Sequence, residues 1–546
     1  MVLIKILFFA IFTSTFSNKS AAVMKKNIVV ELPPEIAFDE NHLQHYIKSL
    51  LQIKEESSFH IRLLKRSIDA RSRTIKVNIH AEIYVDEIPE TIFHHQINYE
   101  NVANAKQCII VGAGPAGLFA ALRLIEFGIK PIILERGKDV KERRRDLASI
   151  NKKNIVNENS NYCFGEGGAG TYSDGKLYTR SGKRGNIDKV LRILVECGAN
   201  PEILVDAHPH IGSNKLPGII ATMRIVIEAH GGTVMFNSHV TGFSFEGSAP
   251  RRITGIEING NDRLEADHVI LATGHSARDI FQLLLDHHIL IEPKPFALGV
   301  RIEHSQNFVD LCQYGVAPRG PYLPAASYAL NAQAENRGVF SFCMCPGGLI
   351  VPAATSPGEI VINGMSLSRR DSPYANSGVV TAVELEDMVS YKDAGVLMGV
   401  ALQREVEQRM FSVGDGTQAA PAQRLTDFLA KRNSIDVPPS SYIPGLFSVP
   451  VHELLPPWIY NRLAYGIRGF DHKMNGYIDT DAVVVATESR TSSPVRVPRD
   501  STSGMHVEVK GLFPCGEGAG YAGGILSAAM DGQYIARAVK QYIQST

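Results

Sequence analysis

Residues 107–135 constrain the fold of this 546-residue chain more than any other segment. The apolar run at 107–111 predicts a strand, and it leads directly into the loop Gly112-Ala113-Gly114-Pro115-Ala116-Gly117. The apolar stretch 118–127 then predicts a helix that ends at Gly128. A strand, a G-x-G-x-x-G loop and a helix in this order are typical of a unit that binds a dinucleotide.

Each glycine of this loop has a separate physical reason. Gly112 permits a tight turn, Gly114 lets the backbone approach a pyrophosphate, and Gly117 allows the helix to pack closely on the strand. The helix N-terminus adds amide donors and positive potential, both of which favour a bound anion. The next predicted strand, 130–134, ends at Glu135, whose carboxylate can accept hydrogen bonds from both hydroxyl groups of an adenosine ribose. The same acid disfavours a 2′-phosphate.

A second glycine-rich segment, residues 509–525, helps to distinguish NAD from FAD, which share the fingerprint. It predicts a strand, a loop that carries the acid Glu517, and the start of a helix near Gly523. The Glu517 carboxylate could accept hydrogen bonds from ribityl hydroxyl groups, which FAD has and NAD lacks. The helix start could direct free amides at a flavin carbonyl. We therefore predict non-covalent FAD, with NAD(P)H only as a transient reductant, because no further strand-associated G-x-G-x-x-G is present apart from these two segments.

The strand and helix patterns divide the chain into several predicted domains. Residues 27–100 mix short strands with one helix, which predicts a small N-terminal α+β domain. Alternating strands and helices at 105–280 predict a parallel sheet, and the pattern returns at 505–546. Residues 281–504 are richer in proline and aromatic residues, so we expect an inserted α+β substrate or cap domain there. The predicted fold class is α/β, with a Rossmann-type FAD domain built from discontinuous segments.

Residues 1–23 resemble a signal peptide in outline. Lys5 precedes an apolar run at 6–12, and Ser20-Ala21-Ala22 offers small residues for cleavage. A run of seven residues is far shorter than the roughly 20 that a membrane-spanning helix needs, so no integral membrane association is expected. A folded domain that starts near Met24 favours an upstream extension instead. We predict a cytoplasmic location and keep export as the alternative.

The composition excludes several classes of partner. The 56 Lys and Arg residues balance the 56 Asp and Glu residues, so the bulk charge recruits neither nucleic acid nor an anionic membrane. Seven cysteines are too few for a disulfide scaffold, and a reducing compartment is expected. The stretch 54–76 holds seven basic residues against three acidic ones. We interpret it as a solvated face, with contact to RNA or an acidic surface as the alternative.

Several motifs outside the fingerprint add a family resemblance over most of residues 60–540. They are Ser67-Ile68-Asp69-Ala70-Arg71, Gly165-Glu166-Gly167-Gly168-Ala169-Gly170-Thr171-Tyr172-Ser173-Asp174-Gly175-Lys176-Leu177, Pro209-His210-Ile211-Gly212, Cys343-Met344-Cys345-Pro346-Gly347-Gly348, Glu488-Ser489-Arg490-Thr491-Ser492-Ser493-Pro494-Val495-Arg496 and Gly516-Glu517. With these motifs the chain resembles bacterial FAD-dependent dehydrogenases of the glutathione-reductase-like flavoprotein class, usually described only as NAD(P)/FAD-dependent oxidoreductases. The resemblance implies an FAD domain assembled from separated segments around an inserted domain, and it implies no substrate.

Arg490 is the main candidate for a catalytic residue. Its guanidinium could bind a carboxylate bidentately or stabilise negative charge on reduced flavin, and the alternative is a salt bridge that fixes the inserted domain. Cys345 is a second candidate, paired with Cys343. Two positions apart on a strand, these cysteines share a face, and strain disfavours a stable disulfide. We therefore expect a structural role for both, with a redox role as the alternative.

The remaining polar candidates are weaker. Cys163 has no C-x-x-x-x-C partner, so we interpret it as a buried structural cysteine. His208 and His210 have the spacing of a metal pair but no apparent third ligand, and no metal site is predicted. Asp174 and Lys176 could lie beside the flavin or merely shape a loop, and we favour cofactor contact. The complete set of predicted cofactor contacts is Gly112, Gly114, Pro115, Ala116, Gly117, Glu135, Arg136, Gly168, Asp174, Lys176, Thr273, Gly274, Gly516, Glu517, Gly523, Gly524 and Ile525.

These inferences predict an FAD-dependent oxidoreductase of the dehydrogenase type. It would transfer a hydride between an unidentified small molecule and FAD at the junction between the FAD domain and the inserted domain. The predicted partner is a small-molecule substrate, with no stable nucleic acid. Two alternatives stay open: a flavoprotein that acts on tRNA through its N-terminal domain, and a non-catalytic FAD-binding scaffold.

Overall fold

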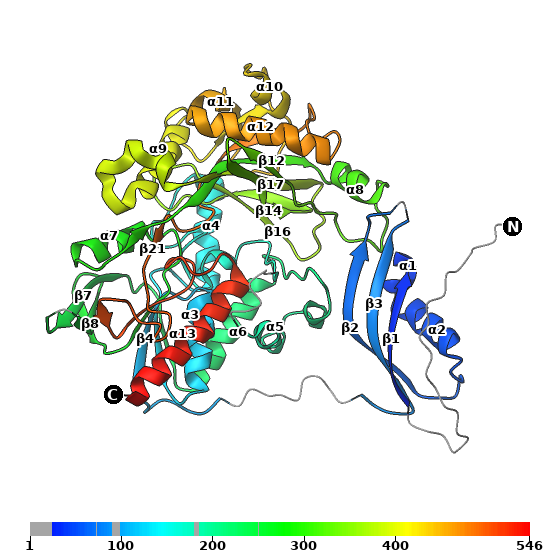
Figure 1. Cartoon of the computed structure of the whole chain (residues 1–546), viewed down its shortest axis with the longest axis horizontal. Helices are drawn as coiled ribbons and strands as arrows, with labels where there is room; N and C mark the ends of the chain where they lie inside the picture. Colours follow the sequence, from blue (N-terminus) through cyan, green and yellow to red (C-terminus); the bar gives the residue numbers. More distant parts are fainter. Residues whose placement is uncertain (1–23, 73, 90–98, 179–184, 249, 546) are drawn as a thin grey trace. The chain divides into compact units, whose positions relative to one another are not determined.

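The computed structural model describes residues 24–545 with the exception of residues 73, 90–98, 179–184 and 249 (Figure 1). The predicted extension at 1–23 lies outside the described residues. The chain divides into two compact units. The described part of the first is residues 24–68 and 76–89, and the second holds the rest of the described chain. No described helix combines the length and the apolar character that crossing a bilayer requires.

The N-terminal unit is a three-stranded sheet with two helices. Its strands follow the order β1-β3-β2, with β1 antiparallel to β3. Alternate residues of β3 are buried and pack with Leu43 and Ile47 of α2. Asp39 caps α2 by accepting a hydrogen bond from the His42 amide at 2.9 Å. The elements are β1 (Met24–Leu32), α1 (Pro34–Ala37), α2 (Glu40–Leu51), β2 (Phe59–Asp69) and β3 (Lys76–Val85).

Strand β2 lies within the basic stretch 54–76, and the sequence pattern did not predict it. Residues 59–63 alternate between apolar and polar, but the alternation that identifies a strand breaks at Leu64.

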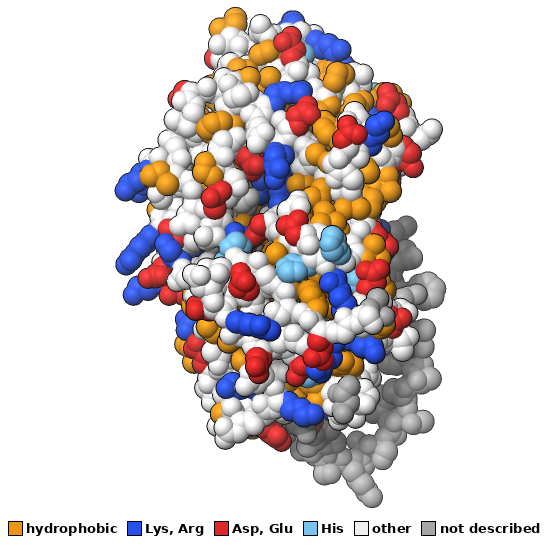
Figure 2. All heavy atoms as spheres, turned by 90° about the vertical axis from the view of Figure 1, so that its left-hand side faces the viewer, with side chains coloured by type: hydrophobic (Ala, Val, Ile, Leu, Met, Phe, Trp, Pro, Cys, Tyr) orange, Lys and Arg blue, Asp and Glu red, His pale blue; other side chains and the backbone are white. Residues whose placement is uncertain are grey.

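The composition of the surface is a separate point. Basic and acidic side chains are interspersed on the face shown in Figure 2, which agrees with the balanced composition.

The second unit is built on a five-stranded parallel sheet in the order β23-β10-β4-β5-β6. Because its strands are parallel, the loops that follow β4, β5, β10 and β23 meet at one edge. Strand β23 comes from the C-terminal part of the chain, so the predicted Rossmann-type domain of discontinuous segments is confirmed. The strands are β4 (Gln107–Val111), β5 (Lys130–Leu134), β6 (Thr233–Met235), β10 (Val269–Leu271) and β23 (Leu512–Pro514).

The two faces of this sheet are covered differently. Cys108 and Ile110 of β4 pack in a core with helices α3, α5, α6 and α13, whereas Ile109 and Val111 pack in a core with β7 and β8. Strands β6 and β7 are separated by a turn at Asn237, which adopts a φ of +53°. The elements are α3 (Pro115–Ile125), α4 (Val140–Lys153), α5 (Ile187–Glu196), α6 (Leu216–Ala229), β7 (Val240–Glu246), β8 (Arg251–Ile258), β9 (Asp262–Glu265), α7 (Arg278–Asp286), β22 (Val509–Lys510) and α13 (Ile525–Ser545), with short 3₁₀ turns at Gly168–Gly170 and Pro201–Leu204.

Residues 292–496 build a second large layer on a seven-stranded sheet in the order β13-β14-β17-β12-β20-β18-β19. Figure 1 shows α11 and α12 above this sheet, on the side away from α3 and α13. The elements are β11 (Glu292–Pro293), β12 (Phe296–Ser305), α8 (Gln306–Tyr314), β13 (Asn331–Ala334), β14 (Arg337–Cys345), β15 (Gly348–Pro352), β16 (Ile362–Ser366), β17 (Tyr374–Val383), a 3₁₀ segment at Leu385–Leu397, α9 (Met398–Ser412), β18 (Ala420–Arg424), α10 (Leu425–Ala430), β19 (Leu446–Ser448), α11 (Val451–Leu454), α12 (Pro457–Lys473), β20 (Val483–Glu488) and β21 (Val495–Arg496).

Candidate functional site

A cavity of about 380 Å³ lies where the loops of the parallel sheet face the inserted layer. Its residues from the parallel-sheet side include the glycine loop, the end of β5, the segment 168–178, the turn after β10 and the start of α13. The inserted layer adds Phe342, Cys343, Asn363, Arg490 and Thr491. Of the predicted cofactor contacts, all line this cavity except Gly117 and Gly516.

The glycine loop is shaped as its sequence predicts. Gly112 has a φ of +105°. A Cβ on Gly117 would lie 2.0 Å from the Gly112 carbonyl oxygen, so Gly117 allows close packing of the helix and does not line the cavity. A Cβ on Gly114 would meet only the Gly168 Cα, at 3.9 Å, which leaves the backbone open to the cavity. Helix α3 has no side-chain cap at its N-terminus, so its first amides can receive a phosphate.

The Glu135 carboxylate is buried and held by three backbone amides. It accepts hydrogen bonds from the amides of Ala113, Gly137 and Gly165, each at 2.9 Å. A carboxylate offers about four acceptor sites, so about one remains for a ligand. The neighbouring loops thus use most of its acceptors, and contact of Glu135 with both ribose hydroxyl groups stays a prediction.

Arg136 lies beside the same end of the cavity. Its guanidinium stacks on Phe164, 4.3 Å from the ring centroid, and pairs with Asp279 at 2.9 Å. His239 also contacts Asp279, at 2.6 Å. Burial alone raises the pKa of Asp279, but the bonds from His239 and Arg136 lower it overall. The charge of Arg136 is thus neutralised, and its flat face rather than its charge borders the cavity.

The C-terminal loop places Glu517 at the cavity. Burial raises the pKa of Glu517 to about 7, against the opposing effect of Lys294. Within the described residues, its carboxylate has no hydrogen-bond or ion-pair partner. Gly516 does not line the cavity; its amide donates to Asp531 at 2.7 Å and anchors the loop. Glu517 is therefore a buried acceptor with no partner in the described part of the chain, which suits a ribityl contact.

The start of helix α13 corrects one detail of the predicted flavin contact. The Gly523 amide donates to the Ser527 hydroxyl at 3.0 Å and is not free. No bond from the amides of Gly524 and Ile525 is found among the described residues. A Cβ on Gly523 or Gly524 would meet nothing within 4 Å. Two amides, rather than three, can therefore receive a flavin carbonyl.

Asp174 and Lys176 line the cavity, but their charged atoms bind the inserted layer. Asp174 pairs with Arg370 at 2.5 Å and accepts a bond from Ser366. Burial by itself raises the pKa of Asp174, and Arg370 and Lys176 lower it. The Lys176 ammonium donates to the Met344 carbonyl. These contacts tie the 168–178 segment to the inserted layer, which is the loop-shaping alternative for Asp174.

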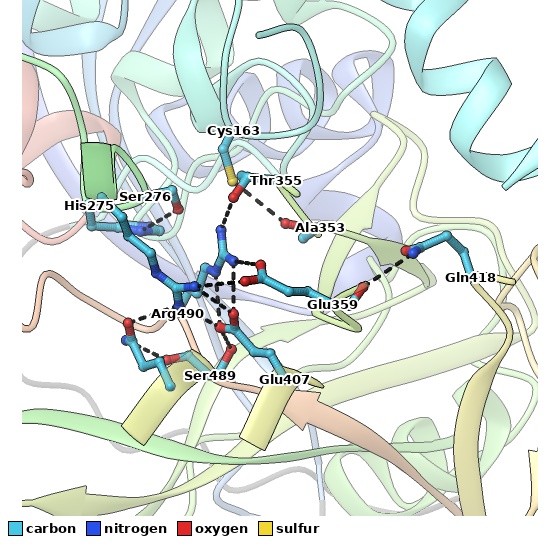
Figure 3. A network of polar contacts seen from close by, with 12 residues as sticks. Cys163, His275, Ser276, Ala353, Thr355, Glu359, Glu407, Gln418, Ser489 and Arg490 are labelled. Carbon is cyan, nitrogen blue, oxygen red and sulfur yellow. Dashed lines mark hydrogen bonds and ion pairs between the residues drawn. The ribbon is translucent and has the colours of Figure 1, made fainter. Parts of the chain in front are cut away.

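Arg490 sits in a buried polar network with Glu359 and Glu407 (Figure 3). Its guanidinium contacts Glu407 at 2.9 Å and Glu359 at 2.8 Å, and it also donates to Thr355. Arg278, the first residue of α7, pairs with the same two glutamates at 2.9 and 3.3 Å. The salt-bridge alternative for Arg490 is therefore present in the structure. Since Arg490 also lines the cavity, its contact with a substrate stays a prediction.

The charges of this network balance each other. Burial raises the pKa of Glu407 by itself, but Arg490 and Arg278 lower it to about 2. Burial and the charge of Glu407 raise the pKa of Glu359. Burial and the nearby guanidinium of Arg490 lower the pKa of His275 to about 4, so His275 is neutral at pH 7.

Cys343 and Cys345 do not share one face of their strand, contrary to expectation. Cys343 lines the cavity, whereas Cys345 is fully buried and does not. Cys163 is half-buried at the cavity wall. The His210 ring is 3.1 Å from the Ser368 carbonyl, and the described residues hold no group of three ligands suited to a metal.

Several lining residues were missed by sequence reasoning. His275 directly follows the predicted Thr273 and Gly274, so that turn carried a local signal. Phe342 and Asn363 carried none, because they come from β14 and β16 and reach the cavity only through tertiary packing.

Comparison with known proteins identifies the family. Residues 295–491 match a family described as FAD-dependent protein, C-terminal domain-like, and residues 24–84 match a domain of unknown function, DUF8436. A protein of Clostridium beijerinckii named only as an uncharacterized protein is 39% identical over 518 residues, which cover 91% of this chain and 95% of that protein. The chain belongs to the family of this Clostridium protein. FAD is the cofactor, as the matched FAD-dependent domain and the free acceptor at Glu517 indicate.

Several solved flavoprotein structures share a distant likeness with this family member. CtdE in complex with FAD is 13% identical with a TM-score of 0.30, over 80% of this chain and 88% of that chain. A geranylgeranyl bacteriochlorophyll reductase-like protein of Thermoplasma acidophilum is 14% identical with a TM-score of 0.33, over 81% and 79%. A flavoprotein/dehydrogenase of Cytophaga hutchinsonii is 12% identical with a TM-score of 0.33, over 81% and 79%. Scores this low carry no information on activity.

Proposed function

We propose that this protein is an FAD-dependent oxidoreductase of the dehydrogenase type, which transfers a hydride between a small molecule and FAD. One observation carries the proposal: residues of the dinucleotide loop and residues of the inserted layer line the same cavity. A cofactor held by the loop at one wall would thus be faced by a second wall of different chemistry. A scaffold that only stores FAD needs no such second wall.

The residues of the chain divide between holding and facing the cofactor. The free amides of α3 suit the pyrophosphate, and the remaining acceptor of Glu135 suits one ribose hydroxyl. Glu517 suits the ribityl chain. When bound, FAD supplies a two-electron acceptor and donor, and the protein supplies position and exclusion of water. Phe342 and Thr491 would form the wall against which a substrate lies.

Membership of the glutathione-reductase-like class is part of this proposal, but without a dedicated domain for NAD(P)H. Members with a dedicated domain for NAD(P)H carry a second dinucleotide loop on a separate sheet, whereas the further G-x-G-x-x-G of this sequence, at Gly518–Gly523, follows β23 of the same parallel sheet. NAD(P)H would therefore enter the cavity only as a transient reductant. The cytoplasmic location and the small-molecule substrate are parts of the same proposal.

Anaerobic bleaching of the flavin tests the function. We expect the purified protein to be yellow, to release FAD on acid precipitation, and to lose flavin absorbance with at least one member of a metabolite panel that includes NADH and NADPH. A flavin that no biological reductant bleaches would support a storage role and contradict the proposal. Copurified RNA with steep salt dependence would instead favour action on tRNA.

A pair of matched variants tests whether the inserted layer faces the substrate. Phe342 lines the cavity, and Phe340 lies two residues earlier on β14 without lining it. We expect Phe342→Leu to change the rate of flavin bleaching by the active reductant without changing FAD content. Phe340→Leu should leave that rate unchanged. Equal rates for both variants would remove this wall from the substrate site.

A further inference from the structure

The strand that carries Cys343 and Cys345 is interrupted by a bulge between them. Phe342 pairs with Gly378 and Cys345 pairs with Asn376, so three steps on β14 face two on β17. Cys343 has a φ of +45°, in the left-handed region. The Cys345 sulfur turns back toward Cys343 and lies 3.2 Å from the Cys343 carbonyl oxygen. The expectation of two cysteines on one face of a regular strand is therefore wrong.

This bulge changes what the pair can do. In an extended strand, residues two apart have Cα atoms about 6.6 Å apart, near the upper limit for a disulfide. A left-handed residue between paired segments shortens the path and redirects the side chains. Cys343 is consequently aimed at the cavity, while Cys345 lies behind it in the protein interior.

Two cations flank this segment. Lys176 donates to the Met344 carbonyl, and Arg301 lies 3.5 Å from the Cys343 carbonyl. Arg301 is fully buried and pairs with Glu488 at 2.8 Å, so part of its charge is balanced. The Lys176 ammonium has no carboxylate within ion-pair distance among the described residues. It is the cation best placed to stabilise an anion at Cys343.

The pKa values of the two thiols diverge accordingly. The Cys345 thiol stabilises the Cys343 thiolate, and this, together with Lys176 and Arg301, outweighs burial and lowers the pKa of Cys343 to about 5. The charge of Asp174 opposes this effect. The pKa of Cys345 is raised, because its proton is shared with Cys343. The lowered pKa of Cys343 favours its thiolate, which is the nucleophilic form.

We propose that Cys343 and Cys345 are a redox-active dithiol that passes two electrons to the flavin in this cavity and closes to a disulfide. This inference rests on the proposed function, since it requires FAD in the cavity. From one thiolate and one thiol, two electrons and one proton leave the sulfur atoms as one S–S bond forms. The flavin takes both electrons and the proton, so charge and atoms balance. Cys343 is the exchanging sulfur and Cys345 the resolving sulfur.

The inference names a substrate class. Electrons would enter or leave the protein by thiol–disulfide exchange at the cavity-facing sulfur of Cys343. Thiols and disulfides small enough to share this cavity with FAD are thus the expected reaction partners. The reaction is reversible in principle, and the relative potentials decide its direction.

Counting electrons tests the pair without measuring turnover. The air-oxidised holoprotein, titrated anaerobically with dithionite, should take up four electrons per FAD. Cys343→Ser and Cys345→Ser should each take up two. Cys312→Ser is the control and should take up four, since Cys312 lies exposed on α8. A wild-type uptake of two electrons with complete flavin bleaching would overturn the inference and leave the proposed function standing.

Thiol labelling of the full-length holoprotein gives an independent readout. After oxidation and denaturation, N-ethylmaleimide should add two fewer labels than after reduction with dithiothreitol, both missing from the peptide that holds Cys343 and Cys345. Equal numbers of labels on the oxidised and the reduced protein would contradict the redox-active dithiol, even if a serine variant fails to fold. Lack of bleaching by any reductant, with the labels still missing, would contradict the proposed function instead.

The pH dependence of alkylation tests the role of Lys176. Iodoacetamide should modify Cys343 at an almost constant rate between pH 6 and 8, because the thiolate is already formed. The charged groups that face it are Lys176, Arg301, Asp174, Glu488 and Glu517. In Lys176→Met the rate at pH 6 should fall by at least about tenfold, with a midpoint at higher pH. A rate that rises tenfold per pH unit in the wild type would show an ordinary thiol.

Discussion

At the scale of single residues, the two buried acids that line the cavity, Glu135 and Glu517, differ in how many hydrogen-bond donors the protein gives them. Glu135 has three amide donors, and Glu517 has no partner among the described residues. These two acids were predicted for similar roles, yet their surroundings differ. Glu135 organises the loops that surround it and keeps about one acceptor for a ligand. Glu517 offers a whole carboxylate, at the cost of desolvation that raises its pKa.

Replacing Glu135 should weaken FAD binding through both of its roles. A hydrogen bond to a charged group contributes about 1.5–3 kcal/mol, so Glu135→Ala should reduce FAD affinity about tenfold to a hundredfold. Glu135→Gln should fare little better, because its amide nitrogen would face a backbone N–H. Titration of apoprotein with FAD measures the effect. Glu142→Ala, at an exposed site on α4, is the control, and equal affinities for all three proteins would remove Glu135 from the site.

At the scale of elements, helix α3 and strand β4 are joined by a contact that permits no side chain. The Gly117 backbone lies so close to Gly112 that an added Cβ would come within 2.0 Å of its carbonyl oxygen. The same packing directs the first turn of α3, and its amides, at the cavity. A local steric demand thereby decides where the cofactor phosphate can bind.

Gly117→Ala should destabilise the protein and lower its FAD content. Overpacking of this kind costs about 1–3 kcal/mol, and the displaced loop would lose its register with the cavity. Gly218 offers a matched control, since it is also the third residue of its helix, α6, and a Cβ there would meet nothing within 4 Å. Gly218→Ala should be neutral or stabilise by about 0.5–1 kcal/mol. Denaturant unfolding and flavin absorbance measure both outcomes, and similar behaviour of the two variants would contradict the packing argument.

At the scale of the whole molecule, the network around Arg490 connects the parallel-sheet side to the inserted layer. Arg278 begins α7, which follows the cavity turn, and Glu407 lies on α9. Glu359 and Glu407 each pair with both Arg278 and Arg490. Removing one carboxylate would leave two buried guanidinium groups to share one.

Glu407→Gln should therefore cost about 3–5 kcal/mol of unfolding free energy, the usual penalty for breaking a buried ion pair. Glu405, on the same helix, pairs with Arg409 at a largely exposed position. Glu405→Gln should cost at most about 1 kcal/mol. Chemical denaturation at pH 7 compares the two, and equal losses would show that the buried network contributes no more than a surface pair.

The stability supplied by Glu407 should also depend on pH. Its folded-state pKa of about 2 lies below its ordinary value of 4.5. A carboxylate with a lowered pKa stabilises the folded state fully above the unfolded-state pKa, and the effect disappears as the pH falls through the folded-state pKa. The difference between wild type and Glu407→Gln should be complete at pH 7 and shrink between about pH 4.5 and 2. A difference that stays constant down to pH 3 would contradict the lowered pKa.

The sequence alone determined the dinucleotide-binding unit, because its requirements are local. The spacing of Gly112, Gly114 and Gly117 meets backbone demands that arise within a few residues, and strands 107–111 and 130–134 were predicted with the bounds that the structure has. The return of the chain at residue 512 was also readable, since it repeats a strand, a loop and a helix. FAD followed from these segments.

Only the tertiary structure decided how the charged and sulfur groups are used. Arg490 meets Glu407 83 residues earlier in the chain and Glu359 131 residues earlier, so no local pattern indicates these partners. The surroundings of Cys343 depend on a bulge in β14 and on Lys176, which comes from another layer. Local backbone conformation depends on neighbouring residues, so the sequence predicts it. Charge balance and pKa depend on distant segments that only the tertiary structure brings together.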